Sequence, residues 1–127
     1  MIQNFLIVGL GGAAGSMLRY AVQKVFQSPN AGAFPTGTLL LNIAGCFLIG
    51  ILWGMISRSL VWNEQMKLLL MTGFCGGFTT FSAFGNETIN MWRDGELALA
   101  FANIATHVVL CLGAVWLSRA IAFQIWN

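Results

Sequence analysis

The stretch from residue 73 to residue 84 reads GFCGGFTTFSAF, and it lies in the middle of an apolar segment long enough to cross a bilayer. Its glycines and threonines predict an interrupted helix, because both residue types are poor formers of a helix interior. In hydrocarbon, an interruption exposes backbone N–H and C=O groups that have no water to bind. Such backbone persists only where it is buried in protein or lines a wet cavity. This stretch is therefore the first place to expect an ion site.

The composition of the whole chain is that of an integral membrane protein. Of its 127 residues, 57% are hydrophobic and 8% are charged, whereas a soluble domain has roughly 25% charged residues. The six Lys and Arg residues are scattered, which argues against a nucleic-acid surface. Three cysteines lie inside apolar segments without metal-ligand spacing, and we interpret them as small buried hydrophobes: Cys46, Cys75 and Cys111.

Four apolar segments each have close to the ~20 residues that cross a bilayer. They are predicted at residues 2–22, 37–57, 68–92 and 97–121. Ser28, Pro29 and Asn30 mark a loop after the first segment. The expected architecture is all-α, a single four-helix transmembrane domain over residues 1–127 with a break in the third helix.

The basic residues give no clear orientation in the membrane. They divide three against three between the two sides, with Arg58, Lys67 and Arg119 on one side and Arg19, Lys24 and Arg93 on the other. The positive-inside rule needs an imbalance to select an orientation. A mixture of both orientations would permit an antiparallel homodimer; the alternative is that translocation partners or boundary residues decide the topology.

Glycines four residues apart occur on three of the segments, at Gly11/Gly15, Gly50/Gly54 and Gly73/Gly77. This spacing lets helices approach closely. Taken together the pairs favour a compact oligomer, although any single pair is explained as well by packing within one chain.

Polar side chains follow one face of three segments. They are Thr38, Asn42 and Cys46; Ser82 and Asn86; and Asn103, His107 and Cys111. Such stripes line a pathway for an anion or serve as hydrogen-bonded contacts between helices. Enzyme signatures are absent from the sequence, because its one histidine has no carboxylate nearby and no nucleophile pattern occurs.

The interrupted stretch itself offers two kinds of ion contact. Phe81 and Phe84 lie one turn apart, and the positive edge of a phenyl ring attracts an anion. The alternative for such a pair is ordinary core packing. Unwound carbonyls over residues 76–79 could bind a monovalent cation, the alternative being a wet glycine-rich kink without metal.

Three motifs resemble those of the Fluc/CrcB fluoride channel family, and the resemblance extends over nearly the whole chain. They are GGAAGSMLR at 11–19, GTLLLN at 37–42 followed by Gly45, and the stretch at 73–84. The resemblance implies a dual-topology, antiparallel homodimer in the bacterial inner membrane. It also implies two fluoride pathways and a structural sodium ion at the two-fold axis.

Particular residues would carry these roles if the family pattern holds. Backbone carbonyls of Gly76 and Thr79 from both chains would bind sodium. The fluoride pore would comprise Asn42, Phe81, Phe84, Ser82, Thr38, Asn103, His107 and Cys111, and the charged residues near the helix ends would be Arg19 and Glu87. Ala83 and Val115 are apolar where some members have Thr, so part of the family's polar track is missing.

The function implied is passive, fluoride-selective export that lowers fluoride toxicity. One alternative is a four-span, dual-topology exporter of small molecules, a class that carries an acidic residue in the first helix. The absence of any acid before Glu64 argues against it. The other alternative is a membrane assembly subunit without a transport role.

Overall fold

The computed structural model describes residues 1–27, 32, 34–58 and 62–126, and within them it is entirely helical apart from short connections. The helices in chain order are α1 (Ile2–Phe26), α2 (Thr36–Arg58), α3 (Glu64–Lys67), η1 (Leu68–Cys75), α4 (Gly76–Phe78), α5 (Phe81–Arg93) and α6 (Leu97–Ile125). Of these, η1 is a π-helix. The loop signals at Ser28, Pro29 and Asn30 lie outside the described residues.

Four helical stretches are long and apolar enough to cross a membrane: Ile2–Phe26, Thr36–Arg58, Glu64–Arg93 and Leu97–Ile125. This confirms the predicted all-α class and the number of spanning helices. The first and fourth extend four residues beyond the expected ends at 22 and 121. Neither extension contains the Gly or Pro that would stop a helix.

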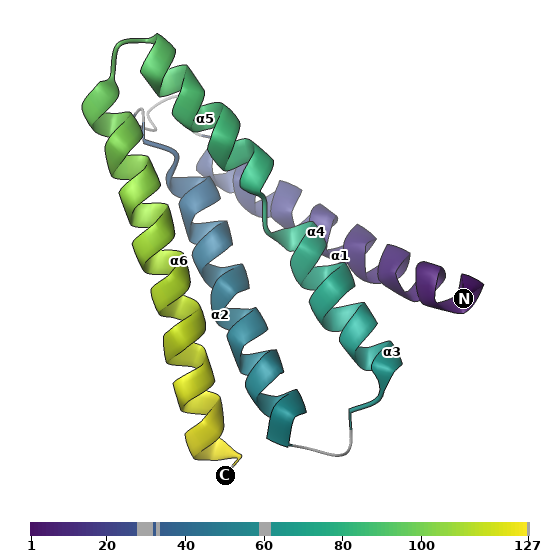
Figure 1. The fold of residues 1–127 in the computed structure, drawn as a ribbon. Coiled ribbons are helices and arrows are strands. Elements are labelled where there is room, and N and C mark those ends of the chain that lie inside the picture. Colours follow the sequence, from purple (N-terminus) through teal and green to yellow (C-terminus); the bar gives the residue numbers. More distant parts are fainter. Residues whose placement is uncertain (28–31, 33, 59–61, 127) are drawn as a thin grey trace.

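Helices α2 and α6 run side by side in the same direction (Figure 1). Their backbones approach closely because Gly50 packs against the hydroxyl of Ser118, and Gly54 against Ala122. A side chain at either glycine would meet these atoms. Trp53 and Phe123 then form an edge-on ring pair with centroids 5.9 Å apart at the next level of the same interface.

Helix α1 lies behind the other helices in Figure 1 and packs on η1 and α4. Glycines occupy both sides of this contact: Gly11 and Gly15 face the backbone of η1 and α4, while Gly73 and Gly77 face the backbone of α1. All three glycine pairs noted in the sequence therefore serve packing within the chain. Packing within one chain, the alternative given for these pairs, therefore accounts for them, and the oligomer stays a prediction.

The third span changes conformation at Thr79, where φ is −81° and ψ is 160°, and at Thr80, where they are −150° and 109°. Helix resumes at Phe81, and the Thr80 hydroxyl caps it by accepting from the backbone N–H of Ala83 at 3.2 Å. The sequence suggests unwound backbone from Gly76, but the structure keeps Gly76–Phe78 helical. Packing of α1 against Gly77 supports this helical turn, since the Gly77 position meets the Gly12 carbonyl oxygen.

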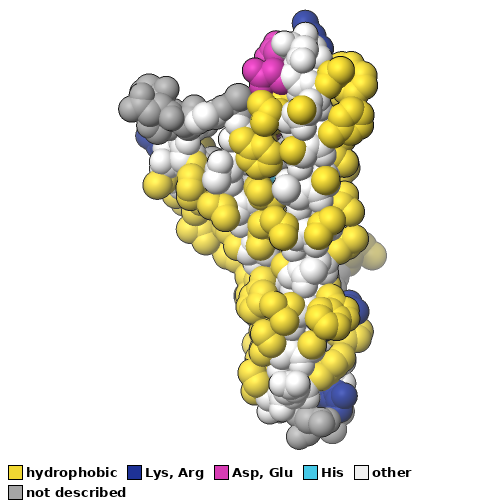
Figure 2. Space-filling view, turned by 90° about the vertical axis from the view of Figure 1, so that its left-hand side faces the viewer, with side chains coloured by type: hydrophobic (Ala, Val, Ile, Leu, Met, Phe, Trp, Pro, Cys, Tyr) yellow, Lys and Arg dark blue, Asp and Glu magenta, His cyan; other side chains and the backbone are white. Residues whose placement is uncertain are grey.

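Hydrophobic side chains cover the middle of the face shown in Figure 2, whereas the visible acidic side chains lie at its upper end and basic side chains toward both ends. This distribution suits a bilayer, in which charged groups stay near the aqueous boundaries.

Candidate functional site

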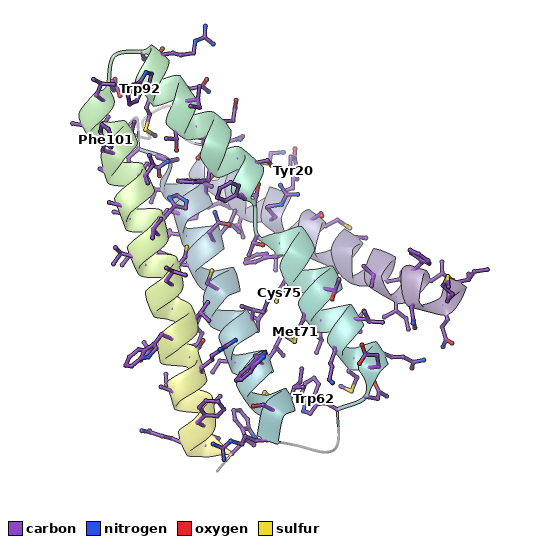
Figure 3. The ribbon with its side chains drawn as sticks, viewed as in Figure 1. Tyr20, Trp62, Met71, Cys75, Trp92 and Phe101 are labelled. Carbon is purple, nitrogen blue, oxygen red and sulfur yellow. The ribbon has the colours of Figure 1, made fainter. Side chains whose placement is uncertain are left out.

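A groove of about 560 Å³ is lined by residues of α2, η1, α4, α5 and α6. Figure 3 shows Met71 and Cys75, two of its lining residues, between η1 and α2. The groove brings together many of the predicted site residues, namely Asn42, Gly76, Thr79, Phe81, Phe84, His107 and Cys111. It thus collects polar groups and aromatic rings from segments far apart in the sequence.

The side chain of Asn42 joins α2 to the extended residues of the third span. Its Nδ2 donates to the carbonyl oxygen of Thr80 at 3.0 Å, and its Oδ1 accepts from the Thr80 N–H at 2.8 Å. Since a backbone N–H can only donate and a carbonyl can only accept, this orientation of the amide is the one that satisfies both. Asn42 is buried at 8% exposure, and its Oδ1 replaces the helical acceptor that the Thr80 N–H lacks.

Three rings follow one another from this point into the groove. The ring of Phe81, directly after Thr80, has its centroid 5.3 Å from that of Phe84, and the two ring planes are inclined by 53°. Phe84 in turn lies 4.3 Å from the imidazole of His107 on α6, with a tilt of 39°. Phe81 is 81% exposed in the single chain, so the outer end of the row is open.

The neutral imidazole of His107 carries its proton on Nδ1 and its lone pair on Nε2. Its Nδ1 lies 3.0 Å from the carbonyl oxygen of Asn103, and a carbonyl only accepts, so Nδ1 carries the proton. Its Nε2 is buried without a hydrogen-bond partner among the residues that the structure describes. His107 is the one side chain in the ring row that changes from acceptor to donor when protonated.

A second set of hydrogen bonds ties α5 to its neighbours. Thr38 Oγ1 donates to Glu87 Oε1 at 2.7 Å. Asn103 Nδ2 donates to Thr88 Oγ1 at 2.9 Å, and Thr88 Oγ1 donates to the Phe84 carbonyl oxygen at 2.7 Å. Thr38 and Asn103 therefore position α5 instead of lining the groove.

Ser82 lies beside the extended residues and is exposed, with its Oγ 3.3 Å from Thr80 Oγ1. It does not line the groove in the single chain.

Arg19 lies seven residues before the end of α1, and its Nε donates to the Gly77 carbonyl oxygen at 2.9 Å. Glu87 lies six residues before the end of α5. Both charged groups are thus within helices and engaged in polar contacts.

The carbonyl oxygens of Gly76 and Thr79 lose the donors that a continuous helix would supply. The Thr80 N–H, the expected partner of Gly76, donates to Asn42 instead. The Ala83 N–H, the expected partner of Thr79, donates to Thr80 Oγ1. Among the described residues no heavy atom lies within 4 Å of where a Gly76 side chain would begin, so this side of the turn is open to them.

Two residues that organise the site were missing from the sequence-based set. Thr80 pairs with Asn42 and caps α5, and Thr88 links Asn103 to the Phe84 backbone. A threonine directly before a helical run is a recognisable N-cap signal, so Thr80 could have been found. Nothing in the local pattern distinguishes Thr88.

Comparison with known proteins agrees with these features. The family model described as CrcB-like protein, Camphor Resistance (CrcB) matches residues 6–119. A protein of Methylocella silvestris named fluoride-specific ion channel FluC is 43% identical over 125 residues, covering 96% of this chain and 95% of the relative. Proteins of the same name are 47% identical in Rhizobium etli (91% of each chain) and 38% identical in Flavobacterium psychrophilum (98% and 100%).

The relatives are named as ion channels, which are not enzymes. Four helices able to span a membrane and a match over most of its length together make this chain a multi-pass membrane protein. The chain belongs to the CrcB family, together with these proteins named fluoride-specific ion channel FluC.

Proposed function

We propose that this chain forms a fluoride-selective ion channel that exports cytoplasmic fluoride passively and so reduces fluoride toxicity. The observation that carries the proposal is the row of Phe81, Phe84 and His107 in a groove beside Asn42, in a chain of this family. Fluoride is small and strongly hydrated, so a selective pathway must replace its water with close, positively polarised groups.

The residues of the groove supply such groups. The ring edges of Phe81 and Phe84 carry partial positive charge. Asn42 uses one of its two Nδ2 protons on Thr80, which leaves a second proton for the anion. Outside the groove of the single chain, the exposed Ser82 hydroxyl next to Thr80 adds a further donor. Because these groups are neutral, they bind fluoride weakly enough to release it, as conduction requires.

We further propose an antiparallel homodimer of two oppositely inserted chains, with two pores. The balanced basic residues support it, because they favour neither orientation. The exposed ring of Phe81 and the open side of Gly76 also support it, because a second chain would cover both.

A sodium ion at the centre of this dimer fits the residues present. Hard cations prefer oxygen ligands, and the carbonyl oxygens of Gly76 and Thr79 have both lost their helical donors. A two-fold axis would bring four such oxygens together. The ion would supply a fixed positive charge that ties the two chains, and fluoride would move without coupling to sodium.

The setting is the inner membrane of a bacterium. Hydrogen fluoride crosses the bilayer, dissociates in the cytoplasm and leaves fluoride trapped there. The membrane potential then drives the anion outward through an open pathway, because moving one charge across 100 mV releases about 2.3 kcal/mol.

Ion efflux from liposomes that contain the purified protein tests the proposal. We expect fluoride efflux that persists when no sodium gradient is present, together with negligible chloride efflux. Comparable chloride efflux would contradict selectivity, and efflux that stops without a sodium gradient would contradict passive transport. In cells, an assembly subunit would leave fluoride tolerance unchanged by Phe81→Ile, whereas a channel predicts its loss.

A further inference from the structure

The three cysteines of the chain all line the groove, each from a different helix. They are Cys46 on α2, Cys75 on η1 and Cys111 on α6. Cys75 is 2% exposed, but Cys46 and Cys111 are only half-buried. Cys46 and Cys111 belong to neighbouring helices whose register is set by the Gly50–Ser118 and Gly54–Ala122 contacts, and their side chains interact across the α2–α6 interface. Cys75 is thus buried as the sequence suggested, whereas Cys46 and Cys111 are partly accessible from the groove.

Helix packing holds the two thiols together. Cys46 lies one turn beyond Asn42 on α2, and Cys111 lies one turn beyond His107 on α6. The two helices run in the same direction and are kept close by the Gly50–Ser118 contact further along. Because both cysteines lie inside long helices, their separation is set by the interface and not by a loop.

We propose that Cys46 and Cys111 form a binding site for a soft, thiophilic metal ion of the Hg²⁺, Ag⁺ or Cu⁺ class, and that the bound ion obstructs the groove. Thiolates are the preferred ligands of such ions. In the case of Hg²⁺, two S–H bonds break, two S–Hg bonds form and two protons pass to solvent, with no change in oxidation state. Among the described residues, no group of three or more His, Cys, Asp or Glu side chains could hold a metal. A two-sulfur site is therefore inferred, and a tetrahedral zinc-type site is excluded for those residues.

The position of this pair gives it a consequence for transport. Four residues along a helix advance about 6 Å, so the thiols lie one turn from the level of Asn42 and His107 in the same groove. A metal bridge between α2 and α6 at this level narrows the groove and fixes these two helices relative to each other. The obstruction of fluoride transport rests on the proposed function, whereas metal binding itself does not.

Titration of the purified protein with HgCl₂ tests the binding site directly. We expect one Hg²⁺ per chain, an ultraviolet sulfur-to-mercury charge-transfer band, and protection of two thiols from a thiol-reactive reagent. Cys46→Ser and Cys111→Ser should each lose the band, and Cys75→Ser should keep it. A band that persists in both Cys46→Ser and Cys111→Ser, or that disappears in Cys75→Ser, would overturn the assignment. Cys46→Ala and Cys111→Ala provide second variants if either serine variant does not fold.

Fluoride efflux from liposomes tests the obstruction. Each variant's efflux with HgCl₂ is compared with its own untreated rate. Hg²⁺ should inhibit the wild type and Cys75→Ser, dithiothreitol should restore efflux, and Cys46→Ser and Cys111→Ser should lose the inhibition. Unchanged efflux with Hg²⁺ bound would overturn obstruction and leave the binding site standing. No efflux in untreated liposomes would instead be a failure of the proposed function, with the binding result unaffected.

Discussion

The two faces of the segment from η1 to α4 are built in opposite ways. On the face toward α1, Gly73 and Gly77 meet backbone directly, and the Gly77 carbonyl oxygen accepts from Arg19 at 2.9 Å. On the face toward the groove, Gly76 has open space beside it and its carbonyl has no helical donor. One face is closed by contacts, and the other keeps polar groups available.

This difference shows how a membrane helix can carry exposed backbone groups. Helices in a bilayer gain little from the hydrophobic effect and associate through close packing and hydrogen bonds. The α1 contact supplies both, and it stabilises the turn whose other face stays open. The closed face therefore allows the open face to function, and changes on the two faces should have different consequences.

The largest effect is expected from filling the closed face. In Gly15→Val the new Cβ would lie 2.9 Å from the Phe78 backbone nitrogen, which cannot move aside as a side chain could. Overpacking of this kind costs about 3 kcal/mol, so unfolding in detergent should begin at a markedly lower temperature. Gly9→Val on the same helix is the control, because nothing lies within 4 Å of that position. Equal stability of the two variants would refute a closed face.

Disrupting the two hydrogen bonds between Asn42 and Thr80 should have the next largest effect. In the wild type, Asn42 Nδ2 donates to the Thr80 carbonyl oxygen at 3.0 Å. Asn42→Asp keeps the shape of the side chain but replaces this donor with a carboxylate oxygen, which repels the carbonyl oxygen. Loss of a buried hydrogen bond costs about 2 kcal/mol, and we expect fluoride efflux to fall at least about tenfold. Asn4→Asp, at an exposed position of α1, should leave efflux unchanged. Wild-type efflux from Asn42→Asp would show that the Asn42–Thr80 hydrogen bonds do not position the rings of Phe81 and Phe84.

A smaller effect is expected from the polar contacts on the closed face. Arg19→Met removes the charged donor to the Gly77 carbonyl and should cost about 1.5 kcal/mol of unfolding free energy. Ser16→Ala removes only a 3.5 Å contact to the same oxygen and should cost no more than about 0.5 kcal/mol. Chemical denaturation of both variants in detergent gives the comparison. The reverse order would mean that Arg19 does not stabilise the turn.

Much of the fold follows from the sequence, because apolar length and helix-stopping residues are local signals. The four spans and the place of Phe81 and Phe84 one turn apart are read from spacing alone. The pairing of Asn42 with Thr80 joins residues 38 positions apart, and it depends on the register between α2 and the third span. The helical conformation of Gly76–Phe78 and the place of Cys46 and Cys111 in one groove likewise depend on how neighbouring helices align. Local pattern carries no information about that alignment.

The most direct test of the central claim compares one aromatic residue from each face. Phe81 lies in the groove, whereas Phe74 stacks on Phe78 with centroids 5.8 Å apart, and the Phe74 backbone meets Gly15 of α1. Fluoride efflux from liposomes is measured for Phe81→Ile and Phe74→Ile, per amount of folded protein. We predict that Phe81→Ile lowers efflux about tenfold or more, since an aromatic contact of about 1.4 kcal/mol is lost, and that Phe74→Ile retains it. Retained efflux in Phe81→Ile together with lost efflux in Phe74→Ile would contradict conduction along the open face.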